Sequence, residues 1–408
     1  MKIKSFTVAG LFGRKDPIHL DFNEDLNILT GRNGSGKTTV LKLLWYMMSE
    51  NIGLALKEMS FEKATLVTTE YECSVRRSGD ISYRIGWRLQ DGQQAEYTLS
   101  PEKDANENLS DPGSYLHNLF TTKSSRSLFS QVNDANEKFS EIGSSIFLPT
   151  FRRIEGGFST KARQVFVGIN ALVNPEKDSL DEALKQLSRK LTNNNHQFVS
   201  SLGTSDIESM LTRQHSNLSE KANKLQEQSN KLQDDVSKAI IEQIQTFEQT
   251  TNPKGEATAT ELLDEIRTRI ENAKKEREAI METIKTIMQP IDTLRQLVMQ
   301  FIRQPGVRLT EEISFGDAAR AIHSDALSSG EKQMLSFLAY NAFNQDTIIF
   351  IDEPELSLHG DWQRQLFPTL LAQQSSNQFV IATHSPFIYS KYPDKELPLD
   401  PVYGDEDE

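Results

Sequence analysis

The sequence has little of several features that would restrict its function. Cys73 is the single cysteine among 408 residues, so no internal disulfide can form and a reducing compartment is expected. No apolar run approaches the ~18 residues that a membrane span requires, and residues 1–16 lack the apolar core of a signal peptide. We therefore expect a cytoplasmic chain without a membrane partner, in which Cys73 is a small strand residue.

Positive charge is also scarce. The formal net charge is −13 and the isoelectric point is about 5.2, which excludes a broadly basic nucleic-acid-binding protein. One local basic cluster remains, formed by Arg152, Arg153, Lys161 and Arg163. It allows three interpretations: contact with nucleotide or nucleic acid, contact with the acidic tail of a neighbouring copy, or a solvated surface.

Glycine almost disappears between residues 174 and 304, where Gln, Lys, Glu and Ser dominate. In the first half, leucines and an alanine recur every seven residues, whereas the companion positions are mostly polar. The companions are His215, Ala222, Ser229, Val236 and Gln243. In the second half a 4–3 spacing holds better. The stripe comprises Ile266, Ile270, Ala273, Arg277, Ile280, Ile284, Ile287, Ile291, Leu294, Val298 and Phe301.

A turn cluster around Asn252, Pro253 and Gly255 separates the two halves. The pattern predicts an antiparallel helical hairpin of roughly 65 Å. A compact helical subdomain with the same stripe on its core is the alternative. Pro290 is expected to kink the returning helix or to mark its entry into the rest of the chain.

Near the N-terminus, a strand-like run at residues 26–30 leads into a glycine-rich turn and then a helical pattern. The turn matches G-x-x-x-x-G-K-[ST], and this context supports a phosphate-binding loop. Glycines let the backbone N–H groups face phosphates, Lys37 reaches the β and γ phosphates, and the Thr38 hydroxyl coordinates Mg²⁺. The predicted nucleotide contacts are Gly31, Arg32, Asn33, Gly34, Ser35, Gly36, Lys37, Thr38 and Thr39.

Two acidic residues, Asp352 and Glu353, end an apolar run at residues 348–351. At a strand end beside a phosphate loop, Asp352 is expected to hold Mg²⁺ through water. Glu353 is expected to orient and deprotonate the attacking water. A strand that merely ends in an acidic turn is the alternative, and the phosphate loop upstream favours the catalytic interpretation.

Two further segments carry polar groups suited to phosphate. Ser328, Ser329 and Gly330 open a helical pattern, which predicts either an anion-binding helix N-terminus or simple capping of the first turn. His384 follows a second apolar strand, where it is expected to hydrogen-bond the γ-phosphate and to sense its loss.

In this order the motifs resemble the ABC-type ATPase heads of the Rad50, SMC and RecF group, and particularly the overcoming-lysogenization-defect branch. The resemblance implies an α/β P-loop ATPase head with an inserted antiparallel coiled-coil hairpin, which binds ATP and Mg²⁺. It also implies a head-to-head dimer, in which Ser328 and Gly330 of one copy contact the nucleotide held by Lys37 of the other. A D-loop-like segment, Glu355 to His359, would lie across the same interface. The implied domains are 1–173 and 305–393 for the head, 174–304 for the insertion and 394–408 for an acidic tail.

Several elements found in members of these families are missing from the sequence, and this narrows the activities that the resemblance implies. Residues 149–153 stand where a coupling glutamine is expected, and no glutamine is present there. Too few residues of this sequence follow His384 to form a TOPRIM domain, so none is expected, and the insertion has neither a Cys-x-x-Cys hook nor an HNH-like cluster. The resemblance therefore implies an ATPase without nuclease activity of its own. It is closest to ATPase subunits of two-gene anti-phage systems, AriA-like first and PtuA-like next.

Three function classes compete. The favoured one is an ATPase sensor and scaffold that controls a separate TOPRIM-type or HNH-type nuclease in anti-phage defence, with a phage-derived trigger and nucleic acid left open as partners. The second is a RecF-like or SMC-like clamp in DNA repair or chromosome maintenance. The third, a transporter ATPase subunit, is disfavoured by the long insertion.

Overall fold

The computed structural model describes residues 1–78, 83–99, 141–150, 180–199, 204–250, 256–301, 328–373 and 375–399. The chain divides into two compact units, Met1–Leu202 with Asn344–Glu408, and Gly203–Phe343. The basic cluster at residues 152–163 lies outside the described residues. The insertion is predicted to span residues 174–304, and these bounds stay predictions. The contacts within the chain separate the two units after Leu202 and after Phe343.

The first unit contains two six-stranded sheets. One is antiparallel, in the order β2-β1-β4-β5-β6-β7. Its strands are β1 (Ile3–Ala9), β2 (Ile18–Asp21), β4 (Lys63–Thr68), β5 (Tyr71–Arg77), β6 (Tyr83–Leu89) and β7 (Gln94–Leu99). Apolar residues alternate along them, so that Phe6 and Val8 of β1 are buried between less buried neighbours. Cys73 of β5 is fully buried, and burial raises the pKa of its thiol well above the usual range. The prediction of a small strand residue is confirmed.

The second sheet is parallel throughout, in the order β12-β3-β11-β10-β8-β9. Its strands are β3 (Leu26–Thr30), β8 (Ser145–Leu148), β9 (His196–Phe198), β10 (Ile348–Asp352), β11 (Gln378–Ala382) and β12 (Glu396–Pro398). The four inner strands are buried on every residue, as expected for a parallel sheet with both faces covered. Because the strands are parallel, all their carboxyl ends meet at one edge of the sheet.

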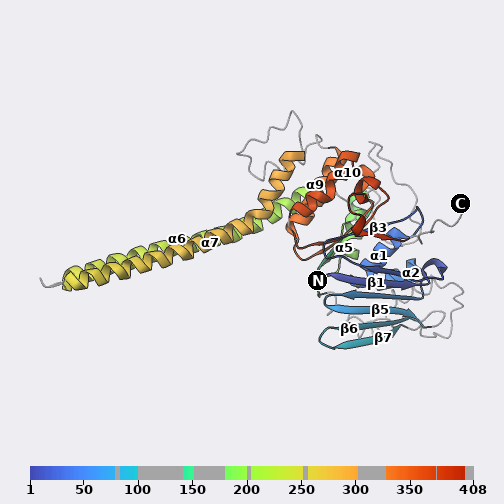
Figure 1. Cartoon of the computed structure of the whole chain (residues 1–408), viewed down its shortest axis with the longest axis horizontal. Helices are drawn as coiled ribbons and strands as arrows, with labels where there is room; N and C mark the ends of the chain where they lie inside the picture. The colour runs from blue at the N-terminus through green and yellow to red at the C-terminus, as the bar shows by residue number, and fades with distance from the viewer. Residues whose placement is uncertain are drawn as a thin grey trace, which may run out of the picture. The chain divides into compact units, whose positions relative to one another are not determined.

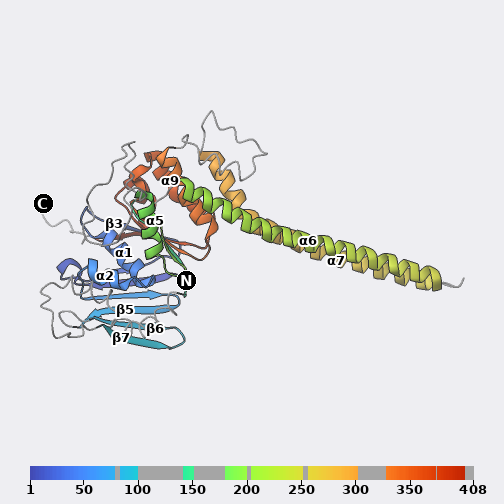
Figure 2. The ribbon, with the colours of Figure 1, turned by 180° about the vertical axis from the view of Figure 1, so that it is seen from behind.

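Helix α1 (Lys37–Met48) belongs to a core shared with both sheets (Figures 1 and 2). Trp45 of this helix packs at a tilt against Phe147 of β8 and Phe198 of β9, with its ring centroid 5.4 and 5.5 Å from theirs. The other elements of this unit are α2 (Ile52–Glu58), α5 (Leu180–Leu191), α10 (Gly360–Ala372), α11 (Pro386–Tyr389) and the short 3₁₀ turns η1 (Leu11–Gly13), η2 (Pro354–Ser357) and η3 (Pro393–Lys395). The core holds α1 rigidly, and with it the loop that precedes the helix.

The second unit is built on two long helices, α6 (Thr204–Thr250) and α7 (Glu256–Phe301), and on the shorter α9 (Ser329–Phe343). Gln243 of α6 contacts Glu265 of α7 at 3.4 Å, so the two helices run antiparallel, and they lie side by side in Figures 1 and 2. The predicted helical hairpin is confirmed. Helix α7 continues through Pro290 and bends in its last turns (Figure 1), as a proline inside a helix predicts.

The mostly polar companion positions of the seven-residue repeat on α6 face inward, although polar side chains contribute little to an apolar helix–helix interface. Ser229 is 1% exposed, and Ala222, Val236 and Gln243 are each partly buried. On α7, Ile291 and Leu294 are buried, whereas Ile270 is 48% exposed and Arg277 is exposed. The 4–3 spacing therefore predicted the inward face of α6 better than the residue types did, and Ile270 is an exception on α7.

Two segments of the first unit differ from the sequence interpretation. Residues 196–198, assigned to the helical insertion, form β9 and pair with β8. Residues 396–398, assigned to a solvated tail, form β12 and pair with β3, and Leu399 is 3% exposed. Both strands have three residues, too few to show a periodicity. None of the described helices combines the length and the apolar character that a membrane span needs.

Candidate functional site

The glycine-rich turn between β3 and α1 has the backbone geometry of a phosphate loop. Gly31, Gly34 and Gly36 have φ angles of 145°, 84° and 96°, in a region where side chains are strained. The Lys37 ammonium donates hydrogen bonds to the carbonyl oxygens of Gly31 and Arg32 at 2.8 and 3.1 Å. Lys37 therefore lies over its own loop, at the positive end of α1, where phosphate groups are stabilised.

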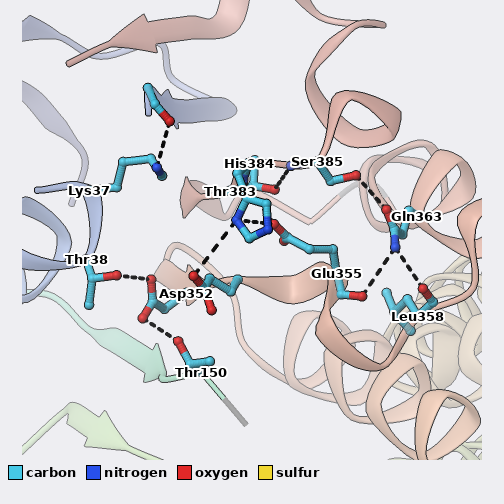
Figure 3. A network of polar contacts seen from close by, with 12 residues as sticks. Lys37, Thr38, Thr150, Asp352, Glu355, Leu358, Gln363, Thr383, His384 and Ser385 are labelled. Carbon is cyan, nitrogen blue, oxygen red and sulfur yellow. Dashed lines mark hydrogen bonds and ion pairs between the residues drawn. The ribbon is translucent and has the colours of Figure 1, made fainter. Parts of the chain in front are cut away.

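Asp352 joins the phosphate loop to the neighbouring strands (Figure 3). It ends β10, is 4% exposed, and its Oδ1 accepts a hydrogen bond from the Thr38 hydroxyl at 2.9 Å. Its Oδ2 accepts one from the Thr150 hydroxyl at 2.6 Å. Thr150 follows β8, the strand beside β10, so the parallel order brings three distant segments together. Thr150 stands where a coupling glutamine is expected, and no motif in the sequence indicates a role for it.

The donor set around Asp352 fits Mg²⁺. Mg²⁺ prefers oxygen ligands and is usually held by one or two carboxylates together with substrate phosphates and waters. Asp352 supplies the carboxylate, and the Thr38 and Thr150 hydroxyls lie on its two oxygens. These three side chains converge at the carboxyl edge of the parallel sheet, where α/β proteins bind ligands.

Glu353 has a strained backbone at the position predicted for the general base. Its φ and ψ are 48° and 60°, a left-handed conformation that is unusual outside glycine, asparagine and aspartate. Its backbone N–H donates to the Ala382 carbonyl at 2.8 Å, which ties it to the end of β11. Such strain concentrates at functional sites, where it aims a side chain. The Glu353 side chain is 22% exposed and therefore accessible from the site.

His384 lies beside two carboxylates after β11. Its ring Nδ1 is 3.3 Å from Glu355 Oε1 and 3.9 Å from Glu353 Oε1 (Figure 3). Its backbone N–H also donates to Glu355 Oε1, at 3.0 Å. The structure therefore brings His384 next to Glu353, one of the two acidic residues that the sequence singles out, and next to Glu355. The resemblance places Glu355 in the D-loop-like segment at the dimer interface and not beside His384, because nothing in the sequence shows that η2 folds back against β11.

Gln363 of α10 extends this network. Its Nε2 donates to the carbonyl oxygens of Glu355 and Leu358, at 3.3 and 2.7 Å. Its Oε1 accepts a hydrogen bond from the Ser385 hydroxyl at 2.5 Å. One amide therefore links η2 to the residue that follows His384.

Ser328, Ser329 and Gly330 lie in the second unit, at the start of α9. The Ser328 backbone N–H and hydroxyl both donate to Glu331 Oε2, at 2.7 and 2.8 Å. The Glu331 backbone N–H points back to the Ser328 hydroxyl at 3.3 Å. This reciprocal pair is a capping box, so Ser328 caps the first turn of α9. A contact between this segment and the nucleotide of a second copy stays a prediction.

A family model described as an AAA ATPase domain matches residues 1–389. The chain belongs to the AAA ATPase domain family. Two curated relatives match parts of it. The "Retron Vc95 probable ATPase" of Vibrio cholerae serotype O1 biovar El Tor is 24% identical over 138 residues, 31% of this chain and 25% of that protein. The "Retron Ec83 probable ATPase" of Escherichia coli is 34% identical over 73 residues, 15% and 14% of the two chains. The matched parts thus span a quarter or less of these relatives.

Solved structures of SMC heads also match this member of the AAA ATPase domain family. The "SMC head domain from Thermotoga maritima" has 12% identity and a TM-score of 0.36, and 96% of this chain and 92% of that one are covered. The Pyrococcus furiosus Smc head bound to the C-terminal domain of ScpA has 13% identity and a TM-score of 0.34, with 95% and 91% covered. At these TM-scores the strand order and the phosphate loop, rather than the superposition, define the α/β P-loop ATPase fold.

Proposed function

We propose that the chain binds ATP with Mg²⁺ and hydrolyses it, and that this reaction controls a separate partner protein in bacterial anti-phage defence. The observation that carries the enzymatic part is the contact of Asp352 with Thr38, which unites the phosphate loop and the acidic strand end. Membership of the AAA ATPase domain family supports it.

The residues divide the chemistry in a simple way. The loop from Gly31 to Thr39 would bind the phosphates, with Lys37 on the β and γ phosphates. Mg²⁺, held by Thr38 and Asp352, would neutralise charge on the phosphate oxygens. Glu353 would orient the attacking water and accept its proton, and His384 would hydrogen-bond the γ-phosphate.

The partner part of the proposal rests on the resemblance and on the relatives. Two relatives are named as probable ATPases of retrons, which supports an ATPase that works within a larger system. We propose that two heads dimerise around ATP, with Ser328 to Gly330 of each copy facing the nucleotide of the other. The controlled partner would be a nuclease of the TOPRIM or HNH type, as the resemblance to the ATPase subunits of two-gene anti-phage systems implies.

A pull-down from the native host tests the partner part. Tagged Glu353→Gln with ATP and Mg²⁺ is the bait, because it should bind ATP and turn over slowly, and Lys37→Ala is the matched control that should not bind ATP. We expect a nuclease-like protein on the first bait only, with recovery unchanged by DNase. Recovery of DNA with repair or chromosome proteins, lost on DNase treatment, would contradict the proposal and favour a DNA clamp.

A further inference from the structure

Glu355, in η2, is a buried carboxylate for which the hydrolysis chemistry above has no task. Its side chain is 6% exposed, although glutamate is seldom buried unless it is paired. Its Oε1 accepts a hydrogen bond from the backbone N–H of His384 at 3.0 Å and lies 3.3 Å from the ring Nδ1 of the same residue. One carboxylate oxygen therefore holds both the backbone and the ring of His384.

This contact bears on which ring nitrogen of His384 carries a proton. An ionised carboxylate can only accept hydrogen bonds, so an oxygen 3.3 Å from Nδ1 favours the form of the ring that carries a proton on Nδ1. Glu353 Oε1 lies 3.9 Å from the same nitrogen, so a second carboxylate faces it as well. When one ring nitrogen is held in this way, the other is left for a ligand. Nε2 is thus the nitrogen of His384 that is left for the γ-phosphate side of the site.

The second oxygen of Glu355 indicates that the carboxylate does not serve packing. Among the described residues, Oε2 is buried and has no hydrogen-bond partner. A buried polar atom without a partner lowers stability, and an apolar side chain at this position would avoid that cost. The favourable interactions of the side chain are those of Oε1 with His384. Glu355 is therefore better explained by what it does to His384 than by the stability of η2.

Gln363 connects the same arrangement to α10. It donates to the carbonyl of Glu355 and accepts from the hydroxyl of Ser385, the residue next to His384. Two links thus join η2 to the segment after β11, one through Glu355 and His384 and one through Gln363 and Ser385 (Figure 3). A displacement of the segment from His384 to Ser385 would have to break the hydrogen bond to Glu355 or the one to Gln363.

We propose that Glu355 is a positioning residue that fixes the ring orientation and the Nδ1–H form of His384, and that Gln363 couples this arrangement to α10. The proposal rests on the proposed ATP hydrolysis, because His384 acts on the γ-phosphate there. In its absence the ring would lose its nearest carboxylate, and Nε2 would face the γ-phosphate for only part of the time.

Steady-state ATP hydrolysis tests the catalytic consequence. Glu355→Gln keeps an acceptor for the His384 backbone N–H and removes the negative charge. We expect kcat to fall about 10-fold to 100-fold, the usual loss when the partner that orients a functional histidine is removed. KM for ATP should stay within about twofold, because the ground-state phosphate contacts are intact. Gln365→Ala is the matched control on α10, since Gln365 is exposed and should leave kcat unchanged.

A double-mutant comparison separates positioning from a general structural effect. In the His384→Ala background, Glu355→Gln should cause no further loss of kcat, since its target is gone. An unchanged kcat in Glu355→Gln alone would overturn the proposal. So would the same fractional loss with and without His384, because Glu355 would then act independently of the ring.

Nitrogen NMR of ¹⁵N-histidine-labelled protein measures the protonation of the His384 ring nitrogens without ATP hydrolysis. The His384 signals, identified by their loss in His384→Ala, should show a protonated Nδ1 in the wild type and a changed pattern in Glu355→Gln. An unprotonated Nδ1 in the wild type, or identical signals in the variant, would overturn the proposal. If the wild type failed to hydrolyse ATP, the proposed function would be wrong, and this measurement would still decide whether Glu355 positions His384.

Discussion

The hydroxyl of Thr150 supplies the sharpest test of the metal pocket, because the sequence assigned it no role. It donates to Asp352 Oδ2 at 2.6 Å, while Oδ1 of the same carboxylate accepts from Thr38. Thr150→Val removes the hydroxyl and keeps the shape of the side chain. Asp352 is 4% exposed, so water has little room to replace the lost donor.

The expected magnitude follows from the type of hydrogen bond. A hydrogen bond to a charged group is worth about 1.5–3 kcal/mol, and about 1.4 kcal/mol corresponds to a tenfold change in affinity. Without Thr150 the carboxylate loses the contact that orients Oδ1 toward Thr38. We therefore expect the Mg²⁺ concentration for half-maximal ATP hydrolysis to rise about 10-fold to 100-fold in Thr150→Val.

The assay is a Mg²⁺ titration of phosphate release at saturating ATP, with ATP affinity measured separately in EDTA. Thr150→Ser keeps a hydroxyl at the same position and should restore most of the Mg²⁺ affinity. ATP affinity in EDTA should be the same in all three proteins. An unchanged Mg²⁺ requirement in Thr150→Val would refute the reasoning that the hydroxyl organises Asp352.

Three further predictions concern separate parts of the chain. Lys37→Ala should weaken ATP binding by about 100-fold or more in an equilibrium binding assay, since the Lys37 ammonium would contact two phosphates through charged hydrogen bonds. Unchanged ATP affinity would contradict the phosphate-loop assignment. Arg277→Leu should change the free energy of unfolding by less than about 0.5 kcal/mol in a denaturant titration, because Arg277 is exposed on α7; unfolding of the variant would indicate a buried ion pair instead. Cys73 should resist alkylation by iodoacetamide in the native protein, since burial raises the pKa of its thiol. It should react once the protein is unfolded in guanidinium. Rapid alkylation of the native protein would show that β5 opens.

The contiguous motifs could be predicted from the sequence because each fixes its own local geometry. The glycines of the phosphate loop adopt the positive φ angles that the motif needs, and the apolar run before Asp352 forms a buried strand. The heptad spacing likewise predicted the pairing of α6 with α7. In each case the sequence pattern and the element that it predicts occupy the same stretch of the chain.

The remaining features depend on contacts between segments that are distant in the sequence. Thr150 contacts Asp352 only because β8 pairs with β10. No sequence pattern near either strand predicts that pairing. Glu355 meets His384 because η2 folds back against the end of β11. β9 and β12 have three residues each, so pairing with β8 and β3 rather than local preference makes them strands. Ser229 is buried by its place in the heptad, although its side chain is polar.

The central claim is that the phosphate loop and Glu353 together hydrolyse ATP, and one paired measurement tests it directly. ATP binding and phosphate release are measured in the same preparations of wild type and Glu353→Gln. We predict that the variant binds ATP as the wild type does while its phosphate release falls about 10²-fold to 10⁴-fold, the usual contribution of a general base. Wild-type phosphate release by Glu353→Gln would contradict the account.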